Sequence, residues 1–313
     1  MLTVLGPTAS GKTTLAVALA DRLHTEIISG DSRQVYRGMD LGTGKDIDDY
    51  TIRRKSMVNG QWSMVNVTVP YHLIDIVDAG AKYTVYDFQR DFREAYDDIT
   101  ARGMEPIFCG GSGLYLESVL RGYRLPDVPA NKQLRDSLEG KSLAELTDIL
   151  ASYKPLHNTT DIDSPQRAIR AIEIEAYCAD HAATLRPFPD IPNITFGISI
   201  PRELRRQRIT ERLHARLDAG MLDEVRGLLN SGIKPEDLIY YGLEYKFLTR
   251  HIIGEISYDQ MVSGLEIAIH QFAKRQMTWF RGMERRGISI HWIDGTLPME
   301  DKVRQILDIV AKK

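Results

Sequence analysis

The stretch GPTASGKT, residues 6–13, constrains the fold more than any other part of this chain of 313 residues. It fits the pattern G-x-x-x-x-G-K-[ST] of a phosphate-binding loop. Such a loop joins a buried strand to a helix, because its glycines turn backbone N–H groups inward and the helix presents its positive end to an anion. The apolar run at residues 2–5 and the helical periodicity of residues 13–23 supply both neighbours. We therefore expect phosphates to bind here.

The composition is that of an ordinary globular protein and argues against several classes of function. Hydrophobic residues make up 43% and charged residues 27%, and the formal net charge is -3. No apolar run approaches the ~20 residues of a membrane span, and the first run leads into the phosphate loop rather than a cleavage site. Two distant cysteines, Cys109 and Cys178, and no H-E-x-x-H motif give no transition-metal site or disulfide framework. A cytoplasmic protein without a membrane partner is expected.

Short apolar runs alternate with helical patterns along much of the chain. Strands are predicted at residues 2–5, 26–29, 106–109, 194–199 and 289–293, and helices at 13–23, 85–102, 143–150, 166–178, 203–229 and 258–286. This order predicts an α/β fold with a parallel sheet and helices on both faces. Ligands of such sheets bind outside the carboxyl ends of the strands, so the loops after the first three strands should meet at one site.

Two segments depart from this alternation. Residues 46–70 are interpreted as a small hairpin or irregular excursion, because Asn59-Gly60 lies between alternating stretches. Residues 122–192 contain several prolines, no strong strand and two helical stretches, and are predicted to form a helical insertion lobe. Residues 1–121 and 193–313 are predicted to form the phosphate-loop core with its C-terminal helices.

Three further stretches place chemistry-bearing residues near the phosphate loop. Asp31 follows the second strand, where a carboxylate can hold Mg²⁺, act as a base or cap the next turn. The loop GTGK, residues 42–45, contains a cation, Lys45, but is a weak motif by itself. The stretch CGGSGLYL, residues 109–116, is either a packing turn or a close approach of the backbone to a ligand. Its first residue, Cys109, is expected to be a small buried side chain.

The end of the third strand argues against one common use of a phosphate loop. A conventional phosphate-loop NTPase has an apolar strand that ends in an aspartate and helps to hold Mg²⁺. Here the strand at residues 106–109 ends in Cys-Gly-Gly. The difference argues against a motor or a switch GTPase and indicates a loop that holds a diphosphate for another reaction.

Taken together, these motifs resemble those of the tRNA dimethylallyltransferases, also called isopentenyl-tRNA transferases. The resemblance rests on GPTASGKT, on Asp31-Ser32, on GMDLGT at 38–43 and on GGSGLYL at 110–116, followed by DSPQRAIRAIEI at 163–174 and AKRQMTWFRG at 273–282. It covers nearly the whole chain in the same order. The chain ends without the zinc finger of eukaryotic relatives, so a bacterial form is expected.

The resemblance implies a reaction and a set of residues for the donor. The family transfers a dimethylallyl group from dimethylallyl diphosphate to N6 of adenine 37 in tRNAs that read codons beginning with U. By this resemblance Mg²⁺ is the cofactor, with Thr13 as its ligand, and the catalytic residues are Asp31, Thr13 and Arg208. The residues expected to bind the diphosphate are Gly6, Thr8, Ala9, Ser10, Gly11, Lys12, Thr13, Arg208 and Arg212. For Arg205, Arg206 and Arg216 of the same helix, a solvated face or tRNA phosphate contact is expected instead.

The resemblance also implies contacts with the anticodon stem-loop of tRNA. The expected tRNA-binding residues are Asp31, Ser32, Gln34, Asp163, Ser164, Gln166, Arg167, Lys274, Arg275, Gln276, Trp279 and Arg281. For Trp279 two roles are possible, which are stacking on a base of the tRNA and packing in the hydrophobic core. Gly110, Gly111 and Ser112 are expected to line the channel that the donor and the base enter from opposite ends. The chain departs from the family in GTGKD at 42–46, where GTAKP is common, and in YYGLEYK at 240–246.

Three other functions remain as alternatives at this level. A relative that prenylates free adenine nucleotides would share the loop and Asp31, but needs neither the insertion lobe nor the DSPQR stretch. A phosphate-loop nucleotide kinase would need a lid with arginines, and an RNA-binding protein with a degenerate site would not need Lys12, Thr13 and Asp31 intact. A monomer without a protein partner is expected.

Overall fold

The computed structural model describes residues 1–58, 61–156, 160–181 and 188–312. Two compact units divide the chain. One contains Met1–Arg121 together with Asp190–Lys313, and the other is Gly122–Pro189. The second unit begins where the insertion lobe was predicted to begin and ends three residues earlier, at 189 instead of 192.

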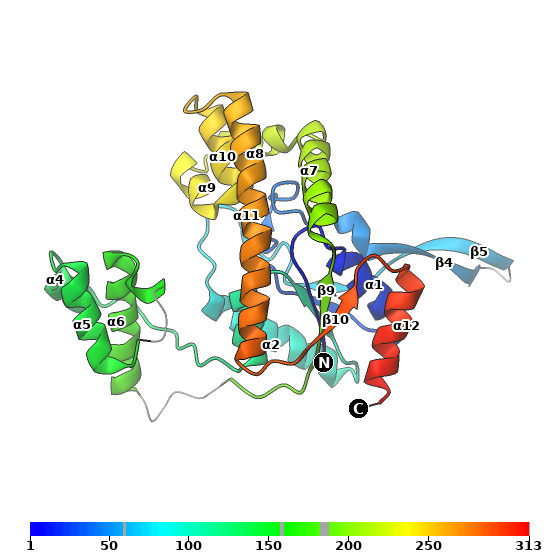
Figure 1. Cartoon of the computed structure of the whole chain (residues 1–313), viewed down its shortest axis with the longest axis horizontal. Coiled ribbons are helices and arrows are strands. Elements are labelled where there is room, and N and C mark those ends of the chain that lie inside the picture. Colours follow the sequence, from blue (N-terminus) through cyan, green and yellow to red (C-terminus); the bar gives the residue numbers. More distant parts are fainter. Residues whose placement is uncertain (59–60, 157–159, 182–187, 313) are drawn as a thin grey trace. The chain divides into compact units, whose positions relative to one another are not determined.

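The first unit is built on a parallel sheet of six strands (Figure 1). In spatial order the strands are β10 (Ile290–Asp294), β9 (Ile194–Ser199), β1 (Leu2–Leu5), β8 (Ile107–Gly110), β2 (Ile27–Ser29) and β6 (Tyr71–His72). Every neighbouring pair is parallel. The predicted fold class is confirmed, and five of these strands coincide with predicted ones to within a residue.

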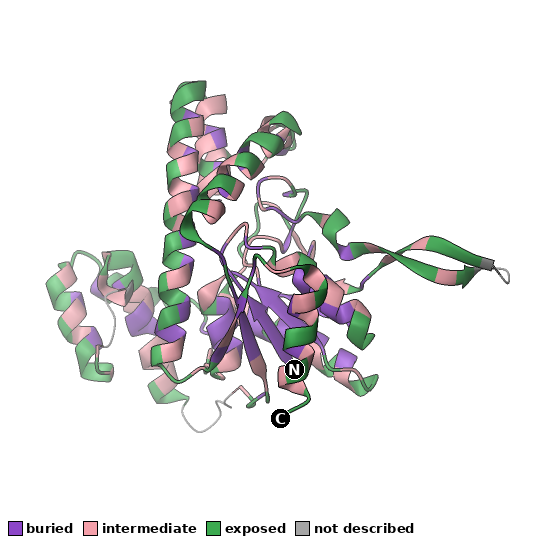
Figure 2. Cartoon of the chain, turned by 45° about the vertical axis from the view of Figure 1, so that its right-hand side comes forward, coloured by how far each residue is buried: buried purple, intermediate pink, exposed green. Residues whose placement is uncertain are grey.

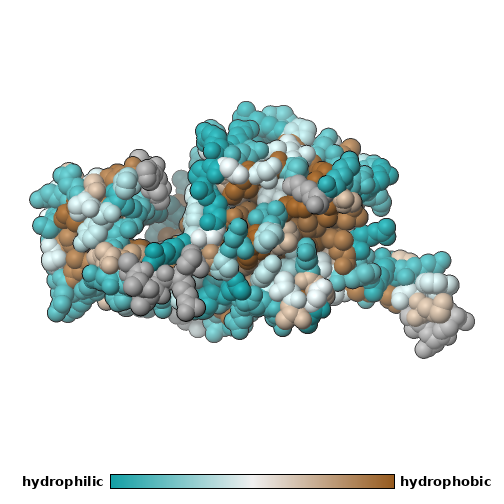
Figure 3. Space-filling view, turned by 90° about the horizontal axis from the view of Figure 1, so that it is seen from below, coloured by the Kyte–Doolittle hydropathy of each residue, from teal (hydrophilic) through white to brown (hydrophobic). Residues whose placement is uncertain are grey.

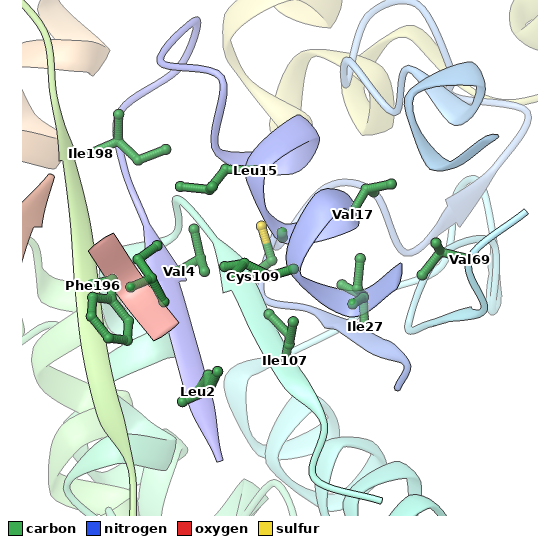
Figure 4. Close-up of a cluster of buried hydrophobic side chains, with 14 of the residues drawn as sticks. Leu2, Val4, Leu15, Val17, Ile27, Val69, Ile107, Cys109, Phe196 and Ile198 are labelled. Atoms are coloured by element: carbon green, nitrogen blue, oxygen red, sulfur yellow. The ribbon is translucent and has the colours of Figure 1, made fainter. Parts of the chain in front are cut away.

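Helices cover both faces of this sheet, as the alternation of side chains along β8 shows. Ile107 and Cys109 point into a core shared with α1 (Lys12–Leu23) and α12 (Met299–Val310). Between them Phe108 points to the opposite face, where its ring meets Phe88 of α2 (Val85–Ala101), with ring centroids 6.1 Å apart. Figure 4 shows the first of these cores and Figure 2 shows the strands almost wholly buried. The continuous apolar runs of the strands therefore follow from burial on two faces.

A second core lies among the helices that follow β9. It joins α7 (Arg202–Asp218), α8 (Met221–Asn230), α9 (Pro235–Tyr241), α10 (Leu243–Ile252) and α11 (Tyr258–Arg285). In Figure 1 the first four lie above the sheet, and the long α11 extends from there down to the level of the sheet. The single helix predicted over 203–229 is wrong. Gly220 interrupts it with a φ of +98°, in the left-handed region that glycine adopts without strain. The chain therefore turns back and α8 packs against α7.

Two short ribbons complete the first unit. Strands β3 (Tyr36–Arg37) and β7 (Val77–Asp78) form a parallel pair, and β4 (Thr51–Val58) pairs antiparallel with β5 (Gln61–Thr68). The hairpin predicted within 46–70 is confirmed, while its predicted turn at 59–60 lies outside the described residues. A 3-10 helix, η1 (Ile47–Tyr50), precedes the hairpin, and α3 (Gly113–Leu120) follows β8.

The second unit is helical. It contains α4 (Lys132–Leu138), α5 (Leu143–Tyr153), the 3-10 helix η2 (Thr160–Ile162) and α6 (Pro165–Asp180), which share a small core. Glu173, almost completely buried, binds Arg135 at 2.8 Å and receives the backbone N–H of Asn131 at 2.5 Å. Although burial acts in the opposite direction, these donors lower the pKa of Glu173 to about 2. The carboxylate therefore ties α6 to the start of α4.

Candidate functional site

The loops that follow β1, β2 and β8 line one cavity of about 1120 Å³ in the first unit. This confirms the expected meeting of the three loops. The strands concerned are neighbours, so their carboxyl ends open at the same edge of the sheet. The helices α7, α10 and α11 supply the remaining walls. The cavity is as large as the largest ordinary small-molecule pockets, so it has room for a diphosphate ester and a base together.

The phosphate loop has the backbone that its sequence predicts. Gly11 has a φ of +81° and Ala9 a φ of +61°, and a Cβ added to Gly6 would lie 2.5 Å from the hydroxyl of Ser10. The first N–H groups of α1 have no acceptor within the helix, and their residues, Lys12 to Thr14, line the cavity. The Ser10 hydroxyl is buried and has no hydrogen-bond partner among the described residues. The loop is therefore a ready anion cradle.

Lys12 is the cation of this cradle. Its side chain is half-buried in the cavity wall and makes no ion pair within the described part of the chain. Burial lowers the pKa of its ammonium group, against the opposing fields of Cys109 and Asp31. A cation that is desolvated but not neutralised is stabilised when an anion enters the cavity. Burial also raises the pKa of the Cys109 thiol to about 12, which makes this cysteine the inert buried side chain that was predicted.

Asp31 shows one of the three roles that the sequence left open, the capping of the next turn. Its Oδ1 accepts the backbone N–H of Arg33 at 2.9 Å, which is the capping interaction. Its Oδ2 has no hydrogen-bond partner among the described residues, and Asp31 lines the cavity together with Lys12. One oxygen therefore fixes the carboxylate, and the other is available to a ligand.

The third loop is fastened to the second. The Ser112 hydroxyl accepts the backbone N–H of Ser32 at 3.0 Å and donates to the Ser32 hydroxyl at 3.2 Å. A Cβ on Gly110 would lie 2.5 Å from the carbonyl oxygen of Gly30, so this glycine is needed for packing. Gly111 and Ser112 line the cavity, whereas Gly110 of the predicted channel is not among the lining residues.

Three arginines spaced four residues apart on α7 face the cavity. Arg208 has no ion-pair partner among the described residues, so its guanidinium is available to an anion. Arg212 contacts Asp46 in an ion pair, and Arg216 binds the same carboxylate at 2.9 Å. The expectation of a solvated Arg216 is wrong, because its side chain is 13% exposed and lies in the cavity wall, whereas the alternative of a tRNA phosphate contact stays a prediction.

The loop at 38–46 is held by carboxylates that the sequence did not single out. Glu224 of α8 accepts the backbone N–H groups of Asp40, Leu41 and Gly42 at 2.8, 2.7 and 3.1 Å. Lys45 is buried, and its ammonium donates to the Tyr36 carbonyl at 2.6 Å and to Asp40 at 2.6 Å, with Asp75 as a third partner. Lys45 is therefore not a cavity ligand but a structural cation beneath the loop.

Helix α11 brings Gln276 and Trp279 to the cavity. Gln276 is buried, and it accepts the N–H of Thr8 at 2.8 Å and donates to the carbonyl of Gly111 at 2.9 Å. Its amide is thus used within the protein to join the first and third loops, which differs from the predicted tRNA contact. Trp279 donates its indole N–H to the fully buried Glu117 at 2.9 Å. The residue remains 39% exposed and lines the cavity, which disfavours a place in the core.

Comparison with known proteins identifies the family. The sequence model described as IPP transferase matches residues 34–283. The chain belongs to the tRNA dimethylallyltransferase (IPP transferase) family. It is 61% identical over 313 residues to "tRNA dimethylallyltransferase 2" of Phocaeicola vulgatus, covering 100% of this chain and 98% of the relative. It is 60% identical to "tRNA dimethylallyltransferase 1" of Parabacteroides distasonis over 99% of this chain and 97% of that one.

Solved structures agree with this assignment. The tRNA isopentenylpyrophosphate transferase of Bacillus halodurans is 30% identical, with a TM-score of 0.69 over 99% of this chain and 95% of that chain. A eukaryotic dimethylallyltransferase crystallised in action on tRNA has a TM-score of 0.78 at 19% identity, covering 100% of this chain and 80% of that chain, and it supports the fold. The protein is therefore a prenyl-transferring enzyme with the phosphate-loop fold of its family.

The remaining predicted residues are placed as follows. In this family member Lys274, Arg275 and Arg281 are exposed on α11 and have no ion pair in the described part of the chain, and only Arg275 lines the cavity. Gln34 lines the cavity and donates to the carbonyl of Gly44 at 3.1 Å. The residues Asp163, Ser164, Gln166 and Arg167 belong to the second unit and lie just before or in the first turn of α6. There Ser164 caps the helix and Arg167 pairs with Asp163 at 2.6 Å.

A divalent metal fits the cavity only with help from a bound diphosphate. No cluster of three His, Cys, Asp or Glu side chains in the described residues could hold a metal by itself. The Thr13 hydroxyl lines the cavity and has no hydrogen-bond partner there. A hydroxyl, phosphate oxygens and water are a normal Mg²⁺ environment, so the residues present fit such an ion. No helix in the described part of the chain is long and apolar enough to cross a bilayer.

Proposed function

We propose that this protein transfers a dimethylallyl group from dimethylallyl diphosphate to N6 of adenine 37 in tRNAs that read codons beginning with U. One observation carries the proposal. A phosphate cradle with an un-neutralised Lys12 and a carboxylate with one free oxygen, Asp31, share a single cavity. The relatives of high identity are named for the same transfer. Because tRNA is a cytoplasmic molecule, we place the enzyme in the cytoplasm.

The phosphate cradle stabilises the leaving group. Lys12, the N–H groups at the start of α1 and the guanidinium of Arg208 surround the position of the diphosphate. Negative charge grows on the bridging oxygen as the bond to carbon 1 of the allyl group breaks, and preorganised donors lower the free energy of that state. Mg²⁺, held by the Thr13 hydroxyl and the phosphates, would supply further neutralisation when bound. Arg212 is a weaker candidate because it is already paired with Asp46.

Asp31 serves the acceptor. The N6 amine of adenine forms its new bond to carbon 1 while the carbon–oxygen bond breaks, and the amine must then lose a proton. The free Oδ2 of Asp31 orients N6 and accepts that proton. The backbone N–H of Arg33 holds the other oxygen at 2.9 Å, which keeps the carboxylate in place for the reaction. Since an aromatic amine is a poor nucleophile, this orientation contributes much of the rate.

The cavity mouth and α11 serve the rest of the tRNA. The target base leaves the anticodon loop to enter the cavity, as base-modifying enzymes require. Trp279 offers an exposed ring that Glu117 fixes from behind, which suits stacking of a neighbouring base. Lys274, Arg275 and Arg281 lie exposed on the same helix and suit phosphate contact. The exposed start of α6, with Gln166 and Arg167, is proposed as a second tRNA contact.

A transfer assay with labelled donor and Mg²⁺ tests this proposal. The acceptors are an unmodified tRNA reading UNN codons, the same tRNA with A37 changed to G, and AMP. Label is expected in the first acceptor only, and Asp31→Ala should abolish it while donor binding remains. A Gln305→Ala enzyme, altered at an exposed position of α12 that does not line the cavity, is the control. Label in AMP would favour the free-nucleotide reaction, and binding of tRNA without any transfer would refute the transferase assignment.

A further inference from the structure

The hairpin of β4 and β5 has two different faces. Register places Ile52, Arg54 and Ser56 on one face and Arg53, Lys55 and Met57 on the other. On the first face Ile52 packs on the main core and Arg54 binds Asp21 of α1 at 3.1 Å. The hairpin is thus anchored at its base through that face. Figure 1 shows the ribbon extending away from the sheet.

The opposite face is exposed along its whole described length. We call it the outer face, and its members are Thr51, Arg53, Lys55, Met57, Trp62, Met64, Asn66 and Thr68. Trp62 is 63% exposed, Met57 58% and Met64 55%. In Figure 2 the ribbon is largely exposed, and in Figure 3 its hydrophilic length leads to paler, more hydrophobic atoms near the tip. Three large apolar side chains on a solvated ribbon indicate a contact surface.

The charge of this ribbon is of one sign. Between residues 51 and 68 the sequence has Arg53, Arg54 and Lys55 and no carboxylate, although the whole chain has a net charge of -3. The Lys55 ammonium lies 5.9 Å from the centre of the Trp62 ring. A cation beside an exposed aromatic ring suits a polyanion with flat bases, since phosphates meet the cation and a base stacks on the ring. A basic protein or an uncharged surface would not be favoured.

The hairpin also starts at the cavity. Two residues that line the cavity lie just before the hairpin: Asp46 directly precedes η1, and Asp49 lies within it. Strand β4 follows η1 directly at Thr51. Eight residues of strand reach about 25 Å. A tRNA whose base occupies the cavity continues outside it, so the ribbon lies within reach of that RNA.

We propose that the outer face of the β4–β5 hairpin is an RNA-contact surface that binds the tRNA backbone and an accessible base outside the cavity. This inference rests on the proposed function, because tRNA is the acceptor there. The hairpin adds affinity for the macromolecular acceptor and plays no part in donor binding. The residues that carry it are Arg53, Lys55 and Trp62.

The experiment uses the full-length enzyme with three variants. The first combines Arg53→Ala with Lys55→Ala, the second is Trp62→Ala, and the third replaces residues 53–66 by Asn-Gly, which closes the ribbon at the paired Ile52 and Val67. Arg54→Ala is the matched control, since it removes the neighbouring cation from the anchored face. KM for tRNA, KM for dimethylallyl diphosphate and the salt dependence of tRNA binding are measured for each.

The KM for tRNA is expected to rise about 5- to 30-fold in all three variants, with the KM for the donor unchanged. The slope of log Kd against log salt concentration should fall by about 1–2 in the Arg53/Lys55 variant and by less in Arg54→Ala. If a variant still transfers the dimethylallyl group, and both its affinity for tRNA and the salt dependence of that affinity are unchanged, the inference is overturned. The proposed function would then remain intact. Loss of self-association or of binding to anionic vesicles, with tRNA binding unchanged, would also overturn the inference. Failure of the wild-type protein to transfer would instead refute the proposed function.

Discussion

Gln276 gives the sharpest test of how the cavity is assembled, because its buried amide joins two loops. Gln276→Leu keeps the approximate volume but removes the acceptor for the Thr8 N–H and the donor to the Gly111 carbonyl. A buried polar group left without a partner costs about 1–3 kcal/mol, so the two groups together could cost about 2–6 kcal/mol. Thr8 is only half-buried, and water can reach its N–H, so we expect about 2–4 kcal/mol.

The cost should appear in stability and in donor binding. Urea unfolding should give a lower midpoint for Gln276→Leu, and calorimetry should show weaker binding of inorganic diphosphate, because the phosphate loop is no longer fixed at Thr8. Gln276→Glu is an informative second variant, since it keeps the acceptor for the Thr8 N–H but replaces the donor by a carboxylate oxygen, with an added negative charge when ionised. Intact stability and diphosphate affinity with weakened tRNA binding would refute this reasoning and restore Gln276 as the tRNA ligand that the sequence predicts.

Three further predictions follow from the charges around the cavity. Asp46→Asn should lower the Kd for inorganic diphosphate, measured by calorimetry, about 3- to 10-fold, because Arg212 and Arg216 lose their carboxylate partner. An unchanged Kd would show that neither arginine reaches the ligand. Burial raises the pKa of Glu244 from 4.5 to about 7, so the folded state binds the proton more tightly and stability falls as the pH rises through that window. Above pH 7, Glu244→Gln should therefore be more stable than wild type by about 1–3 kcal/mol. Below the ordinary pKa of 4.5, where Glu244 is protonated in both the folded and the unfolded state, the variant should have no such advantage. Equal urea midpoints at all pH values would contradict this. Lys45→Met should cost about 1–3 kcal/mol of unfolding free energy, because the Tyr36 carbonyl loses its donor while the exposed carboxylates of Asp40 and Asp75 regain water. Stable protein with weak diphosphate binding would make Lys45 a ligand after all.

The core strands and the phosphate loop could be predicted because their signals are local. The apolar runs that form β1 and β9 are buried on both faces, and GPTASGKT contains its own turn residues. Strand β6 was missed because it has only two residues, Tyr71 and His72, and pairs at the sheet edge with β2. The break at Gly220 was missed because helical periodicity continues on both sides of it, although the glycine itself was a visible signal.

The sequence by itself determined the fold class, the anion cradle and the position of Asp31 after a strand, because each depends on residues close together in the chain. Only the tertiary structure decided what the polar side chains around them bind. Gln276 meets a loop 268 residues away, and Lys45 lies beneath its own loop because Asp75 and the Tyr36 carbonyl surround it. Arg216 faces the cavity because Asp46 pairs with it across 170 residues. Buried hydrogen bonds and ion pairs select partners by position in space, and spacing along the chain does not contain that information.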